Sequence, residues 1–288
     1  MKSAAMHGKV VLITGATAGI GRVTARELAD ADAHVVLAAR SKEKAEATQV
    51  WIFRETGSSS VDFIIGDLSV QSHVRSIAEQ VISRYGGLDV LVNNVGGFFQ
   101  RRFESADGIE MTFALNHLAP FLLTHLLVDA LKRKSPSRVV TVSSDAHARA
   151  SMNFDDLEGR IRYRGWGAYG QSKLANLLFT YELAQRLQGS GITANALHPG
   201  FVASEFGKNN GRGMRLAMSI AHRLGAISVE EGARTSAYLA TSKEVQDVSG
   251  KYFVKCRQAA SVAASRDTGA MRRLWEISAR MTGLATGD

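Results

Sequence analysis

The most constraining feature of this sequence is a regular alternation of short apolar runs with longer segments of helical periodicity. The runs have the length of strands and lie at Val10 to Thr14, His34 to Ala39, Val61 to Ile65, Val90 to Val92, Val139 to Val142, Thr193 to Leu197 and Tyr252 to Lys255. Runs that are apolar throughout are typical of strands covered on both faces, and their alternation with helices predicts a parallel sheet with right-handed crossovers. We therefore predict an α/β fold with a doubly wound, mostly parallel sheet of about seven strands.

We expect residues 1–288 to form a single domain, because the sequence offers no boundary between two. A length of 288 residues is compatible with one α/β domain or two small ones. However, the chain has only three prolines, and no repeat or Pro/Gly-rich linker interrupts the alternation.

Composition excludes several classes of protein. The one cysteine, Cys256, rules out an intramolecular disulfide, and its position after an apolar run predicts a packed core thiol rather than a nucleophile. The net charge of +8 comes from scattered Lys and Arg without a nucleic-acid-binding motif, so we expect no nucleic-acid partner. No apolar stretch reaches the roughly 18 residues of a membrane span, and residues 1–9 lack a secretory signal. We expect a cytoplasmic protein without an integral membrane segment.

The turn after the first predicted strand is rich in glycine and leads into a helix. Gly15, Gly19 and Gly21 follow the pattern G-x-x-x-G-x-G. In such a turn, the first glycine allows a tight bend, the second lets the backbone approach a pyrophosphate, and the third permits close packing of helix on strand. Free N–H groups at the start of the helix also favour phosphate. We predict a Rossmann-type domain that binds a dinucleotide through Gly15, Thr17, Ala18, Gly19, Ile20 and Gly21.

Arg40 ends the second predicted strand, nineteen residues beyond Gly21. An acidic residue at this point would accept hydrogen bonds from the adenosine ribose and repel a 2′-phosphate. A guanidinium can instead bind that phosphate with two parallel hydrogen bonds. Arg40 therefore predicts NADP(H) as the preferred cofactor, with NAD(H) as the alternative.

Tyr169 and Lys173 form a second motif on a helix predicted over Ala168 to Leu187, where the i, i+4 spacing places both on one face. Tyrosine, with a pKa of about 10, is a poor acid/base at neutral pH. A neighbouring ammonium and an oxidised nicotinamide both favour the phenolate, so we expect a lowered pKa of Tyr169. Ser143 and Ser144 end the preceding strand, where a hydroxyl can donate to a substrate oxygen and polarise a carbonyl.

These motifs resemble the short-chain dehydrogenase/reductase family, and the resemblance extends over nearly the whole chain. The matching pieces are Thr14 to Gly21, Asp67-Leu68, Asn93 to Gly96, Asn116, Ser144, Tyr169-x-x-x-Lys173 and Pro199-Gly200. Residues 116–124, 143–147, 172–176, 198–200 and 274–276 are similar to the retinol-dehydrogenase-like branch of that family. The resemblance implies hydride transfer between NADP(H) and a carbonyl or alcohol.

The resemblance also implies roles for individual residues. Tyr169 matches the family's acid/base, Ser144 its donor to the substrate oxygen, and Lys173 its pKa-lowering cation and nicotinamide-ribose ligand. Asn116 matches a fourth catalytic residue, whose backbone carbonyl holds a water; Pro120 lacks an N–H and cannot satisfy that carbonyl within an α-helix. Besides the glycine turn, Arg40, Tyr169 and Lys173 are expected to contact the cofactor. The resemblance implies eight further cofactor contacts: Asp67, Leu68, Asn93, Gly96, Pro199, Gly200, Val202 and Ser204.

Substrate contacts are expected from loops that follow the fourth, fifth and sixth predicted strands. These loops offer Phe98, Phe99, Trp166 and Phe201 as candidate substrate contacts. They predict a small hydrophobic carbonyl or alcohol as the substrate. Gly207, Gly211 and Gly213 lie within residues 201–225 and predict a mobile substrate lid there. Arg160, Arg162 and Arg164 are expected on the surface rather than around an acidic substrate.

Two other functions fit parts of the pattern. A non-catalytic NADP(H)-binding interaction module would keep the fold without needing the tyrosine, lysine and serine. A dinucleotide-dependent epimerase or dehydratase usually carries a larger C-terminal substrate domain, for which the residues after Gly250 leave no space. His147 and His198 show neither an i, i+4 histidine pair nor an H-E-x-x-H motif, so we predict no metal site. A homo-oligomer is compatible with the sequence.

Overall fold

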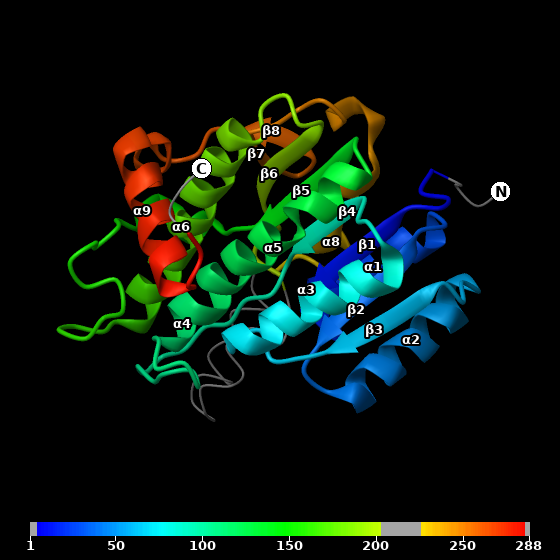
Figure 1. Cartoon of the computed structure of the whole chain (residues 1–288), viewed down its shortest axis with the longest axis horizontal. Helices are drawn as coiled ribbons and strands as arrows, with labels where there is room; N and C mark the ends of the chain where they lie inside the picture. The colour runs from blue at the N-terminus through cyan, green and yellow to red at the C-terminus, as the bar shows by residue number, and fades with distance from the viewer. Residues whose placement is uncertain (1–4, 203–225, 286–288) are drawn as a thin grey trace.

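The computed structural model of the chain describes residues 5–202 and 226–285. Within these residues, a central sheet has helices on both faces (Figure 1). The strands are β1 (Val10–Thr14), β2 (His34–Ala39), β3 (Val61–Ile65), β4 (Val90–Asn93), β5 (Ser137–Val142), β6 (Ile192–His198), β7 (Tyr252–Val254) and β8 (Arg257–Ala259). The longer helices are α1 (Gly19–Asp30), α2 (Lys42–Thr56), α3 (Gln71–Tyr85), α5 (Ala119–Arg133), α6 (Gly165–Arg186), α8 (Val229–Thr241) and α9 (Thr268–Met281).

The strand order is β3-β2-β1-β4-β5-β6-β7-β8, and the neighbouring strands are parallel except for the β7–β8 pair. The predicted doubly wound, mostly parallel α/β domain is therefore confirmed. The order reverses between β1 and β4, which is where sheets of this kind bind ligands beyond the carboxyl ends of their strands.

The described residues form one strand more than the seven predicted. β8 was missed because it has three residues, two of them exposed, and so carries no apolar run. It follows a tight turn in which Lys255 and Cys256 both have a positive φ, at 49° and 60°. Cys256 is partly exposed in this turn. The prediction of a packed core thiol was therefore wrong, because the apolar run ends before the cysteine.

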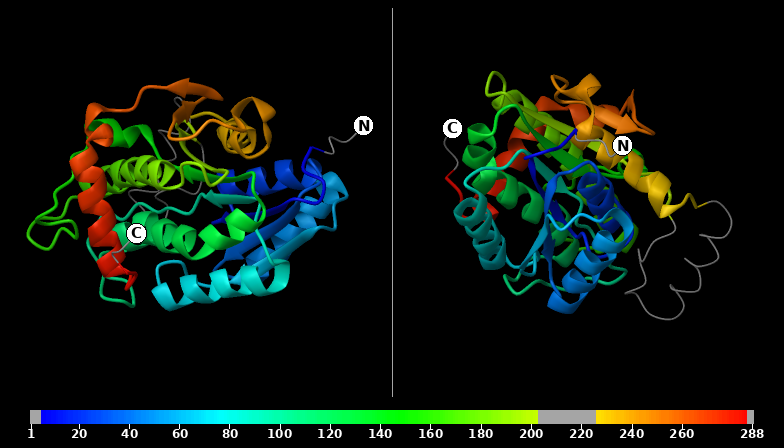
Figure 2. Two further views of the ribbon diagram at one scale, coloured as in Figure 1. Left: turned by 45° about the horizontal axis from the view of Figure 1, so that its top comes forward. Right: turned by 90° about the vertical axis from the view of Figure 1, so that its right-hand side faces the viewer.

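The strands are apolar throughout because successive side chains enter different cores. Leu12 packs into one core with residues of α3 and α5, whereas Val11 and Ile13 pack into another with residues of α1 and α8. Figure 2 shows these helix layers, with α3 and α5 on one side of the sheet and α1 and α8 on the other. Burial on both faces accounts for the absence of polar alternation.

One helical stretch, Met111–Arg133, is long and apolar enough to cross a membrane, and 72% of its most apolar window is buried in the fold. It comprises α4 (Met111–Phe113), a π-helical turn (Ala114–Leu118) and α5. Because the core helix of a globular domain passes the same test, this single stretch is weak support for a membrane span.

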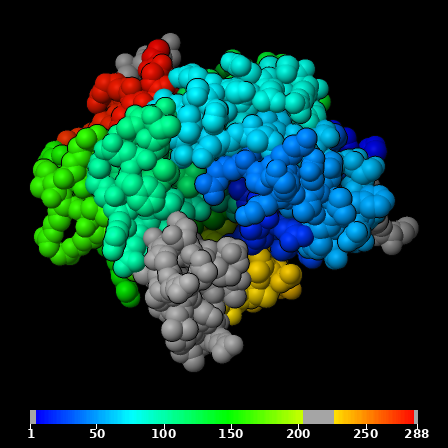
Figure 3. All heavy atoms as spheres, turned by 90° about the horizontal axis from the view of Figure 1, so that it is seen from below, coloured from blue at the N-terminus to red at the C-terminus, as the bar shows by residue number. Residues whose placement is uncertain are grey.

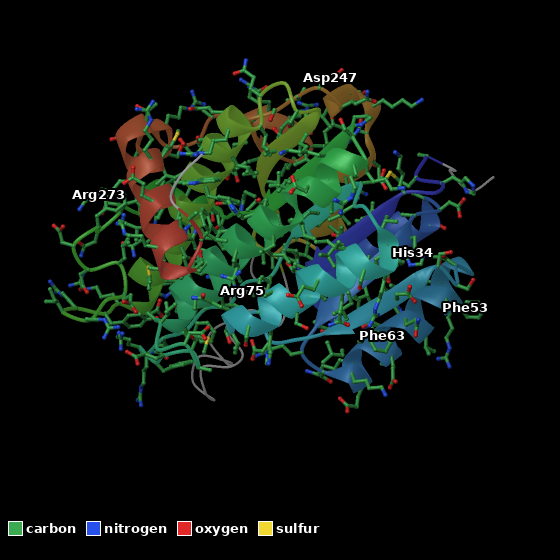
Figure 4. The ribbon with its side chains drawn as sticks, viewed as in Figure 1. His34, Phe53, Phe63, Arg75, Asp247 and Arg273 are labelled. Carbon is green, nitrogen blue, oxygen red and sulfur yellow. The ribbon has the colours of Figure 1, made fainter. Side chains whose placement is uncertain are left out.

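Helix α9 packs on α6 and α5 through Trp275, whose ring lies 6.0 Å from Phe179 and 5.0 Å from Phe121. Its end is held by α3. The Arg75 guanidinium donates to the carbonyl of Thr282 at 2.6 Å, and the label in Figure 4 shows this arginine on α3 facing α9. The last helix therefore joins distant parts of one face of the sheet.

Candidate active site

The glycine turn between β1 and α1 has the geometry of a phosphate cradle. Gly15 and Gly19 have positive φ values of 65° and 52°, which glycine adopts without strain. A Cβ on Gly21 would lie 2.4 Å from Asn94 Nδ2 and 2.6 Å from the carbonyl oxygen of Gly15. Ala18, the N-cap of α1, offers no capping side chain, so the first N–H groups of the helix are available to an anion. These residues fit the pyrophosphate of a dinucleotide.

Asn94 is a site residue that the sequence interpretation missed. Its side-chain amide donates to the carbonyls of Thr14 at 2.8 Å and Gly15 at 3.2 Å, so it fixes the start of the glycine turn. The backbone N–H groups of Asn94 and Val95 donate to the Thr14 hydroxyl, both at 3.0 Å. Four hydrogen bonds thus join the ends of β1 and β4.

Asn93 was the residue predicted to face the cofactor, but its side chain points toward a helix instead. It is buried and donates to the Thr124 hydroxyl of α5 at 2.9 Å. Successive strand residues face opposite sides of a sheet. This alternation was the signal that could have assigned the turn to Asn94, because the two asparagines cannot both face it.

The ends of β2 and β3 carry the residues predicted for the adenosine half of the cofactor. Arg40 directly follows β2, is exposed, and forms no ion pair with any residue in 5–202 or 226–285. Asp67 follows β3, and its carboxylate accepts from the Ser69 N–H at 2.9 Å and the Ser69 hydroxyl at 2.8 Å. Leu68 is buried beside it. These positions line the carboxyl edge next to the glycine turn.

Tyr169 and Lys173 lie on one face of α6, as the spacing predicts. Lys173 is 3% exposed, and its ammonium donates to the carbonyl of Val142 at 3.1 Å. It lies 5.7 Å from the centre of the Tyr169 ring. A Cβ on Gly96 would come within 3.2 Å of the ammonium, so glycine keeps that space open. The end of β5, the start of α6 and the segment after β4 therefore meet at these two side chains.

Burial raises the pKa of Tyr169 to about 12, because the phenolate loses hydration, and the charge of Asp145 adds to this effect. A hydrogen bond with Ser144 acts in the opposite direction. Burial also lowers the pKa of Lys173 to about 8. The predicted lowering of the tyrosine pKa is therefore not found in the protein alone. Desolvation is the largest influence on the tyrosine, and the Lys173 ammonium donates to the Val142 carbonyl instead.

The hydroxyls of the two serines after β5 have different hydrogen-bond partners. The Ser143 hydroxyl is buried and donates to the carbonyl of Lys173 at 2.8 Å, which fixes α6 to the sheet. Ser144 is the hydrogen-bond partner of the Tyr169 hydroxyl, and it also lies 3.1 Å from Asp145 Oδ1. Of the pair, Ser144 is the one that faces the tyrosine, as predicted.

Two histidines hold the backbone around Ser144. His147 Nδ1 lies 2.6 Å from the carbonyl of Ser144, while its Nε2 accepts from the N–H of Val262 at 3.4 Å, so the proton belongs on Nδ1. His198 Nδ1 accepts from the N–H of Asp145 at 3.2 Å. Burial lowers the pKa of His198. Both imidazoles therefore orient the backbone next to Ser144, the hydrogen-bond partner of Tyr169.

Asn116 lies fully buried in the π-helical turn. Its amide donates to the carbonyl of Gly97 at 2.9 Å and to the Ser172 hydroxyl at 3.0 Å, and its oxygen accepts from the N–H of Gly97 at 2.8 Å. The side chain thus fixes the segment after β4 to α6. The role predicted for its backbone carbonyl, opposite Pro120, stays a prediction.

Three aromatic rings meet at the start of α6. Phe98 is buried, with its ring centre 4.4 Å from Trp166 and 6.2 Å from Tyr169, and Trp166 lies 6.1 Å from Tyr169. Phe99 packs instead against Phe103, at 5.0 Å. Of the residues predicted to contact substrate, Phe98 and Trp166 are therefore gathered at the tyrosine.

The segment after β6 closes the carboxyl edge. Gly200 has a φ of 97°, and Val202 pairs with Ile227 in an isolated parallel bridge. Phe201 is exposed, and its carbonyl accepts from the N–H of Ile227. Pro199 precedes this segment at the end of β6. Ser204 and, beyond Val202, the lid predicted over 201–225 lie outside the described residues.

In a space-filling view from below, the surface is hollowed between the blue segments near the N-terminus and the green segments that follow β4 (Figure 3). The glycine turn, the Tyr169–Lys173 pair and the aromatic rings all follow strand ends at the carboxyl edge of the sheet. Such a doubly wound sheet, with a glycine turn and a Tyr-Lys-Ser set at the switch in strand order, defines a class of dinucleotide-binding oxidoreductases.

Within that class, the chain belongs to the short-chain dehydrogenase family, whose sequence pattern matches residues 9–215. It is 43% identical to human (Homo sapiens) Retinol dehydrogenase 13, over 98% of this chain and 86% of the relative. It is 42% identical to Retinol dehydrogenase 12 of Mus musculus, over 96% and 87%. The chain is thus similar to the retinol-dehydrogenase-like branch and is an oxidoreductase of alcohols and carbonyls that uses a nicotinamide dinucleotide.

Solved structures agree with this assignment. An uncharacterized protein from Mycobacterium paratuberculosis is 33% identical, with a TM-score of 0.80 over 100% of this chain and 97% of the other. The Pseudomonas aeruginosa RhlG/NADP active-site complex is 27% identical, with a TM-score of 0.70 over 88% and 97%. The cytoplasmic location and the oligomeric state of this chain stay predictions.

Proposed function

We propose that this chain is an NADP(H)-dependent oxidoreductase that interconverts a hydrophobic ketone or aldehyde and its alcohol, with Tyr169 as the general acid/base. The observation that carries the proposal is the buried Lys173 ammonium, one helical turn from a buried tyrosine whose hydroxyl meets Ser144. Two kinds of relative support it. Several are named retinol dehydrogenases, and one neighbouring structure is an NADP active-site complex.

The dinucleotide would be held by the glycine turn, Arg40, Asp67, Leu68 and Lys173, and when bound it supplies or accepts the hydride. In carbonyl reduction, Tyr169 donates its hydroxyl proton to the substrate oxygen, while the Ser144 hydroxyl donates a hydrogen bond to the same oxygen. Lys173 then stabilises the phenolate that is left. In alcohol oxidation, the phenolate accepts the proton from the substrate hydroxyl.

The tyrosine's surroundings set its protonation state. With a pKa of about 12, Tyr169 is protonated at neutral pH and ready to donate. Oxidation needs the phenolate, which is a minor species under those conditions. The protonated hydroxyl is therefore the form that donates in carbonyl reduction. The rings of Phe98 and Trp166 beside the hydroxyl favour an apolar substrate over a charged one.

A screen of aliphatic and aromatic carbonyls with NADPH and NADH, followed by absorbance of the reduced cofactor, tests the function. Tyr169→Phe should lower kcat by about 1,000-fold, because the proton donor is lost, and leave the cofactor Kd within about threefold. Tyr181→Phe is a matched control, because Tyr181 also lies on α6 but bonds Ser261 away from the site. Binding of NADPH without turnover of any carbonyl would contradict the proposal.

The NADP(H) preference is tested at Arg40. Arg40→Asp should raise the KM for NADPH by about 30-fold, because a charge-assisted contact to the 2′-phosphate is replaced by repulsion, and should favour NADH. Arg54→Asp, at the far end of α2, is the control. An equal loss with both cofactors would show that Arg40 does not bind the phosphate.

A further inference from the structure

Two surface loops beside the candidate active site form one continuous surface. These are residues 98–104, after β4, and residues 158–166, before α6. The Arg102 guanidinium donates to the carbonyl of Glu158 at 2.9 Å, and the Tyr163 hydroxyl donates to the carbonyl of Phe99 at 2.9 Å. Figure 1 shows the second loop, in green, projecting from the body of the molecule at the side of α6 and α9. We call the two loops together the projecting surface.

The projecting surface presents large apolar side chains to solvent. Ile161 is 85% exposed, more than any other large hydrophobic residue among the described ones, and Trp166 and Phe103 are 56% and 45% exposed. Ile161 is held in place, because the Asp156 carboxylate accepts from the N–H groups of Ile161 and its two neighbours at 2.6 to 3.2 Å. Single exposed apolar residues are common, but three on adjoining loops at an ordered tip are typical of an interaction surface.

Arginines surround this apolar tip. Arg101, Arg162 and Arg164 are exposed and form no ion pair with any residue in the described ranges 5–202 and 226–285. The acids on the same loops are already engaged. Asp156 is bonded to the loop backbone, and Glu158 and Glu104 share Arg160 at 3.2 and 3.8 Å. The projecting surface therefore carries an excess of positive charge around an apolar centre.

We propose that the projecting surface docks on an anionic lipid bilayer. An aliphatic side chain at the tip enters the region between headgroups and acyl chains, tryptophan is favoured at that depth, and arginines pair with the lipid phosphates. The charge complementarity selects an anionic surface, and an exposed isoleucine has no counterpart on a nucleic acid. Trp166 belongs both to this surface and to the ring cluster at Tyr169, 6.1 Å away. Docking therefore brings the mouth of the active site to the phase in which an apolar substrate dissolves.

Flotation of the full chain with lipid vesicles tests the proposal without reference to activity. At physiological salt, vesicles with about one-third phosphatidylglycerol should bind the protein at least about tenfold more tightly than pure phosphatidylcholine. Ile161→Asp should weaken that binding by about tenfold or more, because the apolar insertion is lost. The double variant Arg162→Glu/Arg164→Glu should weaken it by about 30-fold and remove the preference for anionic lipid.

Matched controls lie on the opposite side of the molecule. Phe53 on α2 is 55% exposed (labelled in Figure 4), so Phe53→Asp removes a comparable apolar side chain. Arg54→Glu/Arg257→Glu reverses two charges elsewhere. Both controls should bind vesicles within about twofold of the parent protein. Each projecting-surface variant should keep its cofactor affinity and its turnover of a water-soluble carbonyl, which shows that it is folded.

Several outcomes would overturn the proposal. These are equal binding to neutral and anionic vesicles, no binding by the parent protein, or unchanged binding by the Ile161 variant. A fourth outcome concerns size-exclusion chromatography. If the parent protein elutes as a dimer, and Ile161→Asp dissociates the dimer without affecting vesicle binding, then the tip is an interface between two copies.

Discussion

The regions proposed to bind the cofactor and the substrate are built in different ways. In the first, Asn94 and Thr14 join the ends of two buried strands, and nearly every bond involves the backbone. In the second, no strand pairing is involved, and side chains of one loop bond the other loop or the start of α4. The Tyr163 hydroxyl lies 2.9 Å from the Phe99 carbonyl and 3.2 Å from the buried carboxylate of Glu110.

The difference shows what each region can tolerate. The position of the glycine turn is set by strand pairing, so any added atom there must displace a sheet end or a backbone carbonyl. The substrate region depends on side chains that can be exchanged without moving a strand. Changes in the first region should therefore affect cofactor binding strongly, and those in the second should affect substrate selection mildly.

The largest expected effect comes from adding a methyl group to the cofactor region. In Gly21→Ala, the new Cβ meets Asn94 and the backbone of Gly15 within 2.6 Å, so the turn must deform. We expect the cofactor Kd to rise by about 100-fold, which corresponds to about 3 kcal/mol. Isothermal titration with NADPH measures it.

Gly167→Ala is the matched change in the substrate region. Its Cβ would lie 3.6 Å from the Arg164 side chain, an ordinary contact, and the residue is helical. It should leave cofactor affinity unchanged and stabilise the fold by up to about 1 kcal/mol. Similar losses of cofactor affinity in the two variants would show that the regions do not differ as described.

An intermediate effect is expected at His117, which lies next to Asn116 but contacts α9. His117 is buried in the π-helical turn, and its Nε2 lies 2.8 Å from the Ser278 hydroxyl. Burial lowers its pKa to about 4, whereas an unfolded histidine titrates near 6.5. Between these values only the unfolded state gains the proton, so stability is lost as the pH falls through this window.

From pH 7 to pH 5, this histidine should account for about 2 kcal/mol of lost stability. His117→Asn should remove that part of the acid sensitivity, as measured by urea unfolding at both pH values. If the variant loses as much stability on acidification as the parent protein, other groups are responsible.

The smallest effect is expected within the substrate region. Tyr163→Phe keeps the ring but loses the hydroxyl that fixes the Phe99 backbone, so the wall next to Phe98 should loosen. The KM for a bulky carbonyl should rise by about five- to tenfold, which is about 1 kcal/mol, while the cofactor Kd stays constant. In the control Tyr85→Phe, the hydroxyl bonded to Asp62 on the far side of the sheet is removed, and both constants should remain as in the parent.

Much of the cofactor region could be predicted from the sequence because strand alternation determines it. The positions of Gly15 and Arg40 at strand ends follow from apolar runs, and the i, i+4 spacing places Tyr169 beside Lys173. The same alternation could also have predicted that the Asn94 side chain, and not that of Asn93, faces the glycine turn. The fold class needed no information beyond the order of the elements.

The rest depends on contacts between residues far apart in the chain. The raised pKa of Tyr169 comes from burial by several elements, which spacing along one helix does not reveal. The orientation of Phe99 away from the tyrosine depends on Phe103 and on the Tyr163 hydroxyl from another loop. β8 is too short and polar to leave a periodic signal.

Helix α9 has a consequence for how the protein is made. Its Trp275 covers Phe121 and Phe179, residues of helices that are translated long before it. While residues 268–281 are still inside the ribosome, the nascent chain can pair its strands but leaves these rings open to water or to other chains. Truncation before α9 should therefore yield a polypeptide that aggregates or needs a chaperone.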